Sequence, residues 1–349
     1  MSPSKPGFDT ERGMRINQRM RQFLTILLWV LFWGVSHAQQ PKTDYLQSER
    51  GDAQHWTGLK WTPEEAALFG GMPRQAEVRQ HLLVLRYGFY VSHYDAEKRV
   101  PLWVAHVVRS DSADKARGRT KGAWSRNDDK FTPDSKIVLY AKSRKLLFVT
   151  DASYVNANPL ELPVGERSYQ KITRGHLASN VEMKSLGDPE EGLQAQKDSF
   201  SLANVVPQMQ RHNAPIWAKL EDECLEAAKR LGTTVGVVSG PVFAPVVGLP
   251  LPGNEVLFTA GKDGVAIPIP THFFKVVVAR VNGKRVAVGF LIPHRADLGV
   301  KDLGRFVVPV RVIEGVTGID FMPEIRTNDE LETKSEARWF GAIPANVSQ

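Results

Sequence analysis

One segment restricts the possible folds of this chain more than any other. Residues 213–232 read NAPIWAKLEDECLEAAKRLG, and their apolar side chains recur at helical spacing. Asn213 is a suitable N-cap, Pro215 suits the first turn, and Gly232 suits the end of a helix. The segments on both sides read as strands. One prominent helix between two groups of strands predicts an α+β domain.

The strand-like segments are apolar or aromatic runs separated by polar turns. They cover 81–94, 101–110, 136–155, 233–245 and 271–293. We interpret 136–155 and 271–293 as hairpins, the second of them turning at the sequence NGK. Residues 62–71 predict a short helix capped by Thr62, and the charged stretch 111–134 predicts a surface loop.

The first 38 residues have the plan of a secretory signal peptide. A basic stretch precedes the apolar run FLTILLWVLFWGV (23–35), and SHA offers small residues before a cleavage point after Ala38. The run is short for a membrane span, although an uncleaved anchor is the alternative. We therefore predict a signal peptide over 1–38, an N-terminal extension over 39–80, a catalytic domain over 81–325 and a polar tail over 326–349. The predicted product is secreted or periplasmic, with no stable membrane association after cleavage.

Charge and cysteine content add weaker restrictions. The chain has a formal net charge of +7, and residues 1–38 contribute five basic and two acidic residues. The remainder is then only mildly basic, which supports a nucleic-acid partner weakly. The single cysteine, Cys224, excludes an internal disulfide.

Polar residues that no core requires stand between 126 and 221, and each has an ordinary structural explanation. His176 could be a packed strand-end residue, Asn213 a helix cap, and Glu221 a solvated residue of a helix face. Arg126 lies in a charged loop, and Asn204 could satisfy backbone groups in a turn. The chain has no Walker loop, HExxH, CxxC pair or GxSxG motif.

Considered together, these residues meet the requirements of phosphodiester hydrolysis better than they fit chance. An unperturbed imidazole titrates near pH 6.5, so His176 can accept a proton at neutral pH. Mg²⁺ prefers oxygen ligands and keeps most of its waters, so the amide oxygen of Asn213 can suffice as protein ligand. Glu221 follows eight residues later, about 80° around an ideal helix, within reach of metal-bound water.

Five blocks of sequence resemble the DNA/RNA non-specific endonuclease family. They read TRGHLASN, FSLANVVPQMQRHNAPIWAKLEDE, VVSGPVF, IPTHFFKVVV and IEGVTGIDF, in this order, and the similarity runs from about residue 85 to 323. The resemblance implies a ββα-metal (His-Me finger) nuclease fold, with a central antiparallel sheet and flanking helices. It also implies Mg²⁺ as cofactor, with Mn²⁺ as an alternative.

By match to the family motifs, the resemblance implies a role for each polar residue. His176 would be the general base, Asn213 the metal ligand, and Glu221 would hold metal-bound water. Arg174 and Asn204 would support the phosphate and the site geometry, and Arg126 matches an upstream arginine less securely.

Thr173 stands where family members usually have Asp, and LASN replaces the usual residues after the histidine, so activity could be weakened. The main hypothesis is an exported endonuclease that grips the phosphate backbone of DNA and RNA. The alternatives are a weakened-site member that mainly binds nucleic acid, and a hydrolase of small phosphodiesters. A homodimer and an inhibitor protein remain open.

Overall fold

The structure is a computed structural model that describes residues 56–76, 81–118, 131–159, 171–243, 258–325, 331 and 338–341. The chain divides into two compact units, Met1–Gly51 and Asp52–Gln349, and every described residue belongs to the second. The predicted signal peptide, Arg126 and most of the predicted tail therefore lie outside the described residues. Within the described ranges, no helix has the length and apolar character needed to cross a membrane.

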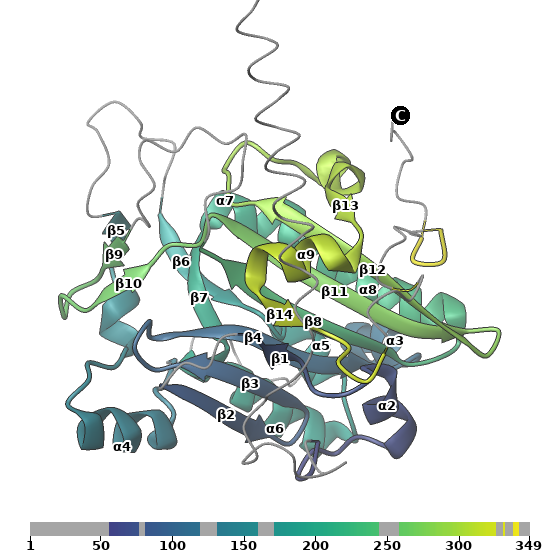
Figure 1. Cartoon of the computed structure of the whole chain (residues 1–349), viewed down its shortest axis with the longest axis horizontal. Helices are drawn as coiled ribbons and strands as arrows, with labels where there is room; N and C mark the ends of the chain where they lie inside the picture. Colours follow the sequence, from purple (N-terminus) through teal and green to yellow (C-terminus); the bar gives the residue numbers. More distant parts are fainter. Residues whose placement is uncertain are drawn as a thin grey trace, which may run out of the picture. The chain divides into compact units, whose positions relative to one another are not determined.

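A seven-stranded antiparallel sheet forms the centre of the described unit (Figure 1). Its strand order is β13 (Val307–Val308), β12 (Lys284–Pro293), β11 (His272–Val281), β8 (Val235–Val242), β4 (Val100–Val108), β3 (Tyr90–Asp95) and β2 (Leu82–Tyr87). Strands β4 and β8 are buried along their whole length, because helices cover both faces of the sheet. The prediction of an α+β fold with a central antiparallel sheet is confirmed.

The two faces of the sheet belong to two separate hydrophobic cores. Side chains alternate along each strand, so Val104 and Val277 join one core while Ala105 and Val276 join the other. The first core includes residues of α5 (Asn180–Lys184) and α8 (Ala218–Leu231), and we call this side the α8 face. The second includes residues of α2 (Pro63–Leu68) and α9 (Val310–Thr317), and we call it the α2 face.

Several local predictions are confirmed. Thr62 caps α2 in a capping box with Glu65. Strands β11 and β12 form the expected hairpin, with Asn282 and Gly283 at φ of 51° and 77° in the turn. Both positive values suit a tight two-residue turn. Gly232 ends α8 in the left-handed conformation, with φ of 64°.

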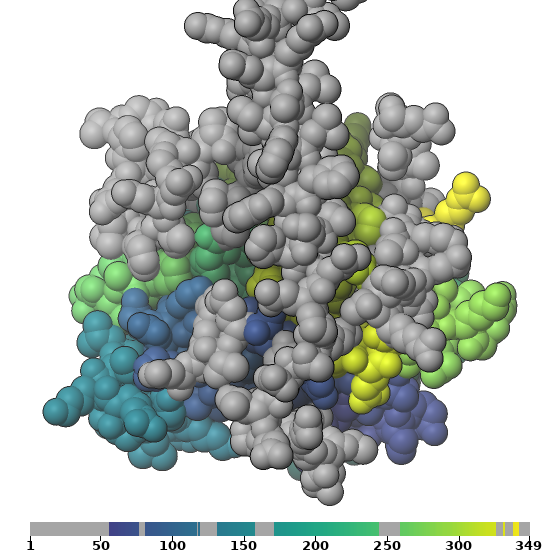
Figure 2. All heavy atoms as spheres, viewed as in Figure 1, coloured from purple at the N-terminus to yellow at the C-terminus, as the bar shows by residue number. Residues whose placement is uncertain are grey.

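The predicted hairpin over 136–155 is wrong. Residues 135–144 form the helix α4 (Ser135–Arg144), followed by the 3₁₀ helix η2 (Asp151–Tyr154). The Asp134 side chain caps α4 by accepting from the backbone N–H of Lys136, and Ile137 and Ala141 form its buried stripe. The apolar run IVLY suggested a strand, but only one of its four side chains is buried. In Figure 2 this segment lies at the surface, in teal at lower left, where Leu139 is 69% exposed.

The remaining elements surround the central sheet. They are α3 (Ser112–Gly118), α6 (Pro189–Ser199), η3 (Leu202–Asn204), η5 (Val300–Phe306), the pair β1 (Arg74–Gln75) with β14 (Ile319–Asp320), and the small sheet of β5 (Asn158–Pro159), β9 (Phe258–Ala260) and β10 (Ala266–Pro268). Helix α3 replaces part of the surface loop predicted for 111–134. A further two-stranded sheet, β6 (Ile172–His176) with β7 (Val205–Met209), carries the candidate site.

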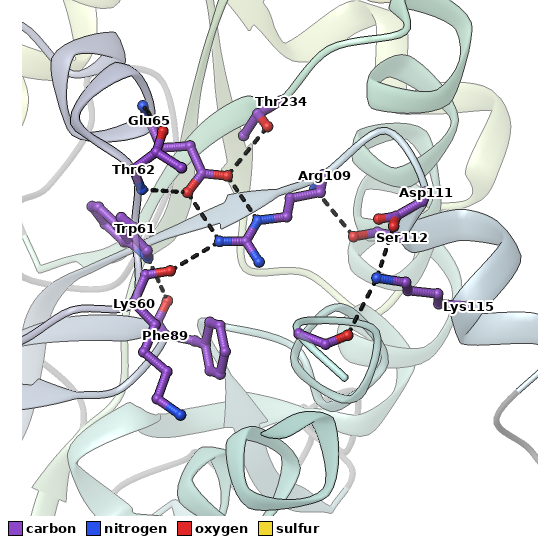
Figure 3. A network of polar contacts seen from close by, with 11 residues as sticks. Lys60, Trp61, Thr62, Glu65, Phe89, Arg109, Asp111, Ser112, Lys115 and Thr234 are labelled. Carbon is purple, nitrogen blue, oxygen red and sulfur yellow. Dashed lines mark hydrogen bonds and ion pairs between the residues drawn. The ribbon is translucent and has the colours of Figure 1, made fainter. Parts of the chain in front are cut away.

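The end of the predicted N-terminal extension is packed against the domain. Trp61 and Phe69 stack at a centroid distance of 5.2 Å. Glu65 is 6% exposed and pairs with Arg109, whose Nε lies 2.7 Å from one carboxylate oxygen (Figure 3). Burial opposes the ionised form, but the Arg109 guanidinium holds the pKa of Glu65 below its usual value. Residues 56–69 are therefore part of the folded unit.

Candidate active site

The two-stranded β6–β7 sheet fixes the register of the Arg-Gly-His motif. His176 pairs with Val205 at one end of the ladder, and Ile172 pairs with Met209 at the other. The Thr173 hydroxyl donates to the backbone carbonyl of Gln208 at 2.9 Å. Thr173 stands where the family usually has Asp, and in this chain its side chain links β6 to β7.

A close approach between β6 and β7 requires a glycine at position 175. A Cβ atom at this position would lie 2.2 Å from Oε1 and 2.6 Å from Cβ of Gln208. Gln208 is fully buried, and its Nε2 lies 2.9 Å from Nδ1 of His212. The glycine between Arg174 and His176 thereby gives room to a side chain that reaches the residue before Asn213.

His176 ends β6 between two aromatic rings. The ring centroids of Phe131 and Phe200 lie 5.1 and 5.2 Å from the imidazole, which is 9% exposed. Asn204 holds the chain immediately after it: Oδ1 accepts from the Ala178 N–H at 2.8 Å, and Nδ2 donates to the Ala178 carbonyl at 2.9 Å. Asn204 is fully buried, and these two bonds hold the backbone that follows His176.

Arg174 is held by the 3₁₀ helix η2. Its Nη2 lies 2.6 Å from Oδ1 of Asp151 and donates to the carbonyl of the same residue at 3.1 Å. The guanidinium carbon lies 5.3 Å from the centroid of Phe131, the ring that also contacts His176. Arg174 is 25% exposed, and its buried Nε has no hydrogen-bond partner within the described residues.

Asn213 is not the N-cap that the sequence suggested. The helix begins earlier, as α7 (Gln210–His212) with Met209 at the N-cap, and passes through the π-helix η4 (Asn213–Trp217) into α8. Asn213 has helical φ and ψ of −62° and −46°, and its carbonyl accepts from the Ala218 N–H. Such π turns inside helices occur frequently at functional sites.

Two histidines hold the junction between β7 and this helix. Nε2 of His294 accepts from the Met209 N–H and Nδ1 donates to the Pro270 carbonyl, both at 2.8 Å. Burial lowers the pKa of His294 to about 4, consistent with the neutral tautomer that these two bonds require. Burial, with His294 and His272 nearby, lowers the pKa of His212 well below its usual value.

Glu221 lies half-buried in the first turn of α8, two turns beyond Asn213. The segment after His176 returns to this helix, since Val181 and Lys184 of α5 line one hollow together with Lys219 and Asp222 of α8. The structure therefore brings the segment that bears His176 and the helix that bears Asn213 and Glu221 to one region. Arg126 falls outside the described residues.

Sequence reasoning missed several residues that shape this region. They are Phe131, Asp151, Phe200, Gln208, His212 and His294. Gln208 and His212 stand inside the quoted motif block, but Gln208 lies in β7 and His212 in α7, so helical spacing does not indicate their contact. Asp151 and His294 come from distant segments, and nothing in the local sequence indicates where they pack.

Comparisons with known proteins identify the family of this chain. The family model described as DNA/RNA non-specific endonuclease matches residues 73–328. "Nuclease EXOG, mitochondrial" is 28% identical over 249 residues in Xenopus laevis and 30% over 244 in Danio rerio. These matches cover 70% and 68% of this chain but only 60% and 61% of the relatives, so the chain spans less than two thirds of their length.

Two further similarities bear on the family and the fold. "Endonuclease G, mitochondrial" from Homo sapiens is 28% identical over 237 residues, covering 68% of each chain. A solved structure titled as an EndoG/EndoGI complex aligns with a TM-score of 0.52 and 23% identity, covering 76% of this chain and 95% of that one. At this identity the structural match supports the ββα-metal fold alone. With the family model matched over most of its length, the chain belongs to the DNA/RNA non-specific endonuclease family.

Proposed function

We propose that this chain is an endonuclease that hydrolyses phosphodiester bonds of DNA and RNA with little sequence preference. One arrangement carries the proposal. His176 ends β6, and the partner strand β7 leads directly into the helix that carries Asn213 and Glu221, in the family order. A site that grips phosphate oxygens rather than base edges would not distinguish the two sugars or the sequence.

His176 is proposed as the general base that takes the proton of the attacking water. The rings of Phe131 and Phe200 restrict the imidazole from two sides, and Asn204 fixes the segment that follows it. A base held in this way keeps its orientation through the reaction, which favours proton transfer along one direction.

Asn213 is proposed as the Mg²⁺ ligand, with Glu221 holding metal-bound water. The donor set fits the ion, because an amide oxygen and a nearby carboxylate are hard oxygen donors, and Mg²⁺ retains several waters. Within the described residues, no group of three or more His, Cys, Asp or Glu side chains is placed to hold a metal. When bound, the ion would supply charge stabilisation at the phosphate and at the leaving oxygen.

Arg174 is proposed to stabilise the negative charge that develops on the phosphate. Its pairing with Asp151 orients the guanidinium and leaves Nε without a hydrogen-bond partner in the described part of the chain. The planar fork of arginine can serve a carboxylate and a phosphate from different edges. Arg126 is proposed as a second contact to the phosphate.

A nicking assay tests the proposal. Purified protein is incubated with supercoiled plasmid and with RNA in Mg²⁺, with and without chelator. We expect His176→Ala to lose about 10²- to 10⁴-fold in rate, the usual contribution of a positioned general base. Asn213→Ala should need a higher Mg²⁺ concentration to reach half of its maximal rate. The matched control is His81→Gln, which lies outside the β6–β7 sheet. Equal nicking by wild type and His176→Ala would refute the assignment.

The same assay separates the alternatives. Salt-dependent retention of DNA without cleavage in Mg²⁺ or Mn²⁺ would indicate a nucleic-acid-binding member with a weakened site. Turnover of a chromogenic diester with polymeric DNA left intact would indicate a hydrolase of small phosphodiesters.

We also propose that the chain is exported, on the strength of the basic stretch and the apolar run 23–35. N-terminal sequencing of the product recovered from the extracellular or periplasmic fraction should begin at Gln39. Retention of residues 1–38 in a membrane fraction would support the uncleaved anchor instead. A homodimer and an inhibitor protein remain predictions.

A further inference from the structure

A lysine lies fully buried beneath the π-helix that carries Asn213. Lys275 of β11 is 0% exposed, and its Nζ donates to Oγ of Ser239 on the neighbouring strand at 2.9 Å. The same Nζ lies 4.7 Å from the ring centroid of Trp217, the last residue of η4. The indole N–H of Trp217 is buried without a hydrogen-bond partner among the described residues. The ring of Trp217 is in cation–π contact with the Lys275 ammonium.

A buried carboxylate of opposite charge lies in α5, the helix that follows His176. Glu182 of α5 is 0% exposed, its Oε2 lies 3.0 Å from Nε2 of His106, and it accepts from the Ser179 N–H at 3.2 Å. Burial opposes ionisation, but the neighbouring His106 and the Lys275 ammonium hold the pKa of Glu182 below its usual value. The carboxylate is therefore charged at neutral pH.

The two sets of contacts support two segments that are distant in sequence. Ser179 and Glu182 form the capping box that starts α5, and Ser179 follows His176 by three residues. Trp217 ends the π turn whose first residue is Asn213. Glu182 thus ties the segment behind the candidate base to His106 of β4, and Lys275 of β11 contacts the turn that carries the candidate metal ligand. The two buried groups carry opposite charges that attract each other.

Stability alone does not explain this arrangement. Moving an ion into a protein interior has a penalty of several kcal/mol per ion, and well-packed apolar residues at such positions are often as stable or more stable. The best-attested benefit of buried charges is that they fix one register among alternatives. A π turn is a place where register matters, because one extra residue is accommodated in the helix.

We propose that Lys275, balanced by Glu182, is a positioning residue that holds the π-helix η4 in the register that directs Asn213 toward the metal. The metal itself rests on the proposed function. The positioning concerns contacts within the protein, those of Lys275 with Ser239 and Trp217.

The experiment compares Lys275→Met, Glu182→Gln and the double variant with wild type. Mn²⁺ binding is measured by electron paramagnetic resonance without nucleic acid. Amide hydrogen exchange is measured at Ala218, whose N–H bonds to the carbonyl of Asn213 and reports the π turn directly. Global stability is measured by urea unfolding. Arg109→Met is the matched control, since it breaks a part-buried ion pair whose partners lie at 60–65 (Figure 3).

We expect Lys275→Met to weaken Mn²⁺ binding by about 10- to 100-fold, as loss of a ligand-orienting partner typically does. Exchange at Ala218 should accelerate more than in Arg109→Met at equal global stability. The double variant removes the buried lysine and the buried carboxylate together, so it should regain stability while Mn²⁺ binding stays weak and exchange at Ala218 stays fast.

Two results would overturn the proposal. In the first, the double variant regains stability, Mn²⁺ affinity and slow exchange at Ala218 together. Lys275 and Glu182 would then only balance each other's charge. Alternatively, Lys275→Met could match Arg109→Met in both measurements. Failure of the proposed function is distinguishable: wild type would then leave nucleic acid uncut or bind no Mn²⁺, while exchange at Ala218 would still decide the positioning role.

Discussion

The two faces of the central sheet both bury an apolar core but treat polar groups differently. On the α2 face, Ala105, Val238 and Val276 stand in neighbouring strands as an apolar layer. On the α8 face, the adjacent residues of the same strands are His106, Ser239 and Lys275, all fully buried. The sheet is thus a conventional core on one side and a polar support on the other.

The difference follows from what each face has to hold. Helix α2 has one ion pair, Glu65 with Arg109, but α2 and α9 otherwise cover the sheet through apolar contacts without fixed direction. The α8 face supports the π-helix and the start of α5, whose side chains must be aimed. Hydrogen bonds and charge pairs are directional, so they specify orientation where apolar packing does not. We expect mutations on the two faces to separate stability from metal binding.

The largest expected effect comes from two adjacent phenylalanines of β11. Phe274 packs on the α2 face, 5.1 Å from the ring of Phe321, whereas Phe273 lies 5.4 Å from Trp217 on the α8 face. Either change to Ala should lower the free energy of unfolding by about 3–5 kcal/mol. Only Phe273→Ala should also weaken Mn²⁺ binding per folded molecule, measured by paramagnetic resonance.

Such losses could unfold a marginal domain, so Phe273→Leu and Phe274→Leu form a milder pair with the same expected order. Equal weakening of Mn²⁺ binding by both members of a pair would contradict the division of labour between the faces.

The second effect is a pH dependence that belongs to the α8 face. Burial lowers the pKa of His294 to about 4, below the value near 6.5 of an unfolded histidine. The unfolded chain therefore binds more protons between these values, so this contribution to stability is complete above pH 6.5 and is lost as pH falls toward 4. The expected loss is on the order of 3 kcal/mol.

Urea unfolding across this pH range measures the loss. His294→Gln can still accept from the Met209 N–H but does not titrate, so its stability curve should be flatter. An unchanged slope in this variant would show that other groups, such as His272 and His212, carry the dependence.

Much of the fold could be predicted from the sequence because its signals are local. The Thr62 cap, the Asn282–Gly283 turn and the Gly232 helix end each depend on a few adjacent residues. The helix α4 could not, since its apolar run IVLY has strand character and only its packing makes Ile137 and Ala141 the buried pair. Local propensity is a weak prior that tertiary contacts override.

The candidate site divides in the same way. The order of His176, Asn213 and Glu221 was legible in motif blocks, but the start of the helix was not. Pro215 and Asn213 suggested that the helix begins at 213. The helix actually begins at Gln210 as α7 and continues into the π-helix η4. The supports of the site, Lys275 and His294, come from strands and loops far along the chain, where a charged or imidazole side chain gives no sign of burial.

The third effect concerns two glycines that lie against side chains on different surfaces. A Cβ at Gly236 would meet Phe69 at 2.8 Å and Val278 at 2.9 Å, both of the α2 face. A Cβ at Gly175 would meet Gln208 at 2.2 Å. Overpacking typically costs about 1–3 kcal/mol, and we expect both Gly→Ala variants to lose that much stability.

Only Gly175→Ala should also reduce Mn²⁺ binding and nicking, because Gln208 leads to His212 beside Asn213. Adding Gln208→Ala removes the clash and should restore part of the stability but not the metal response. Full recovery of both would show that Gln208 merely fills space.

The smallest effect gives the sharpest comparison, because the chain carries the same device on both faces. Thr62 with Glu65 caps α2, and Ser179 with Glu182 caps α5, each as a complete capping box. Thr62→Ala and Ser179→Ala should each lower the free energy of unfolding by about 1 kcal/mol. The two glutamates have different partners: Glu65 pairs with Arg109, whereas Glu182 pairs with His106, and the Lys275 ammonium helps to lower the pKa of Glu182. Loss of the Ser179 cap should therefore accelerate amide exchange at Ala218, whereas loss of the Thr62 cap should leave it unchanged. Equal exchange in the two variants would mean that a cap on the α8 face is only a cap, and the polar support would then end at Glu182 without reaching the π turn.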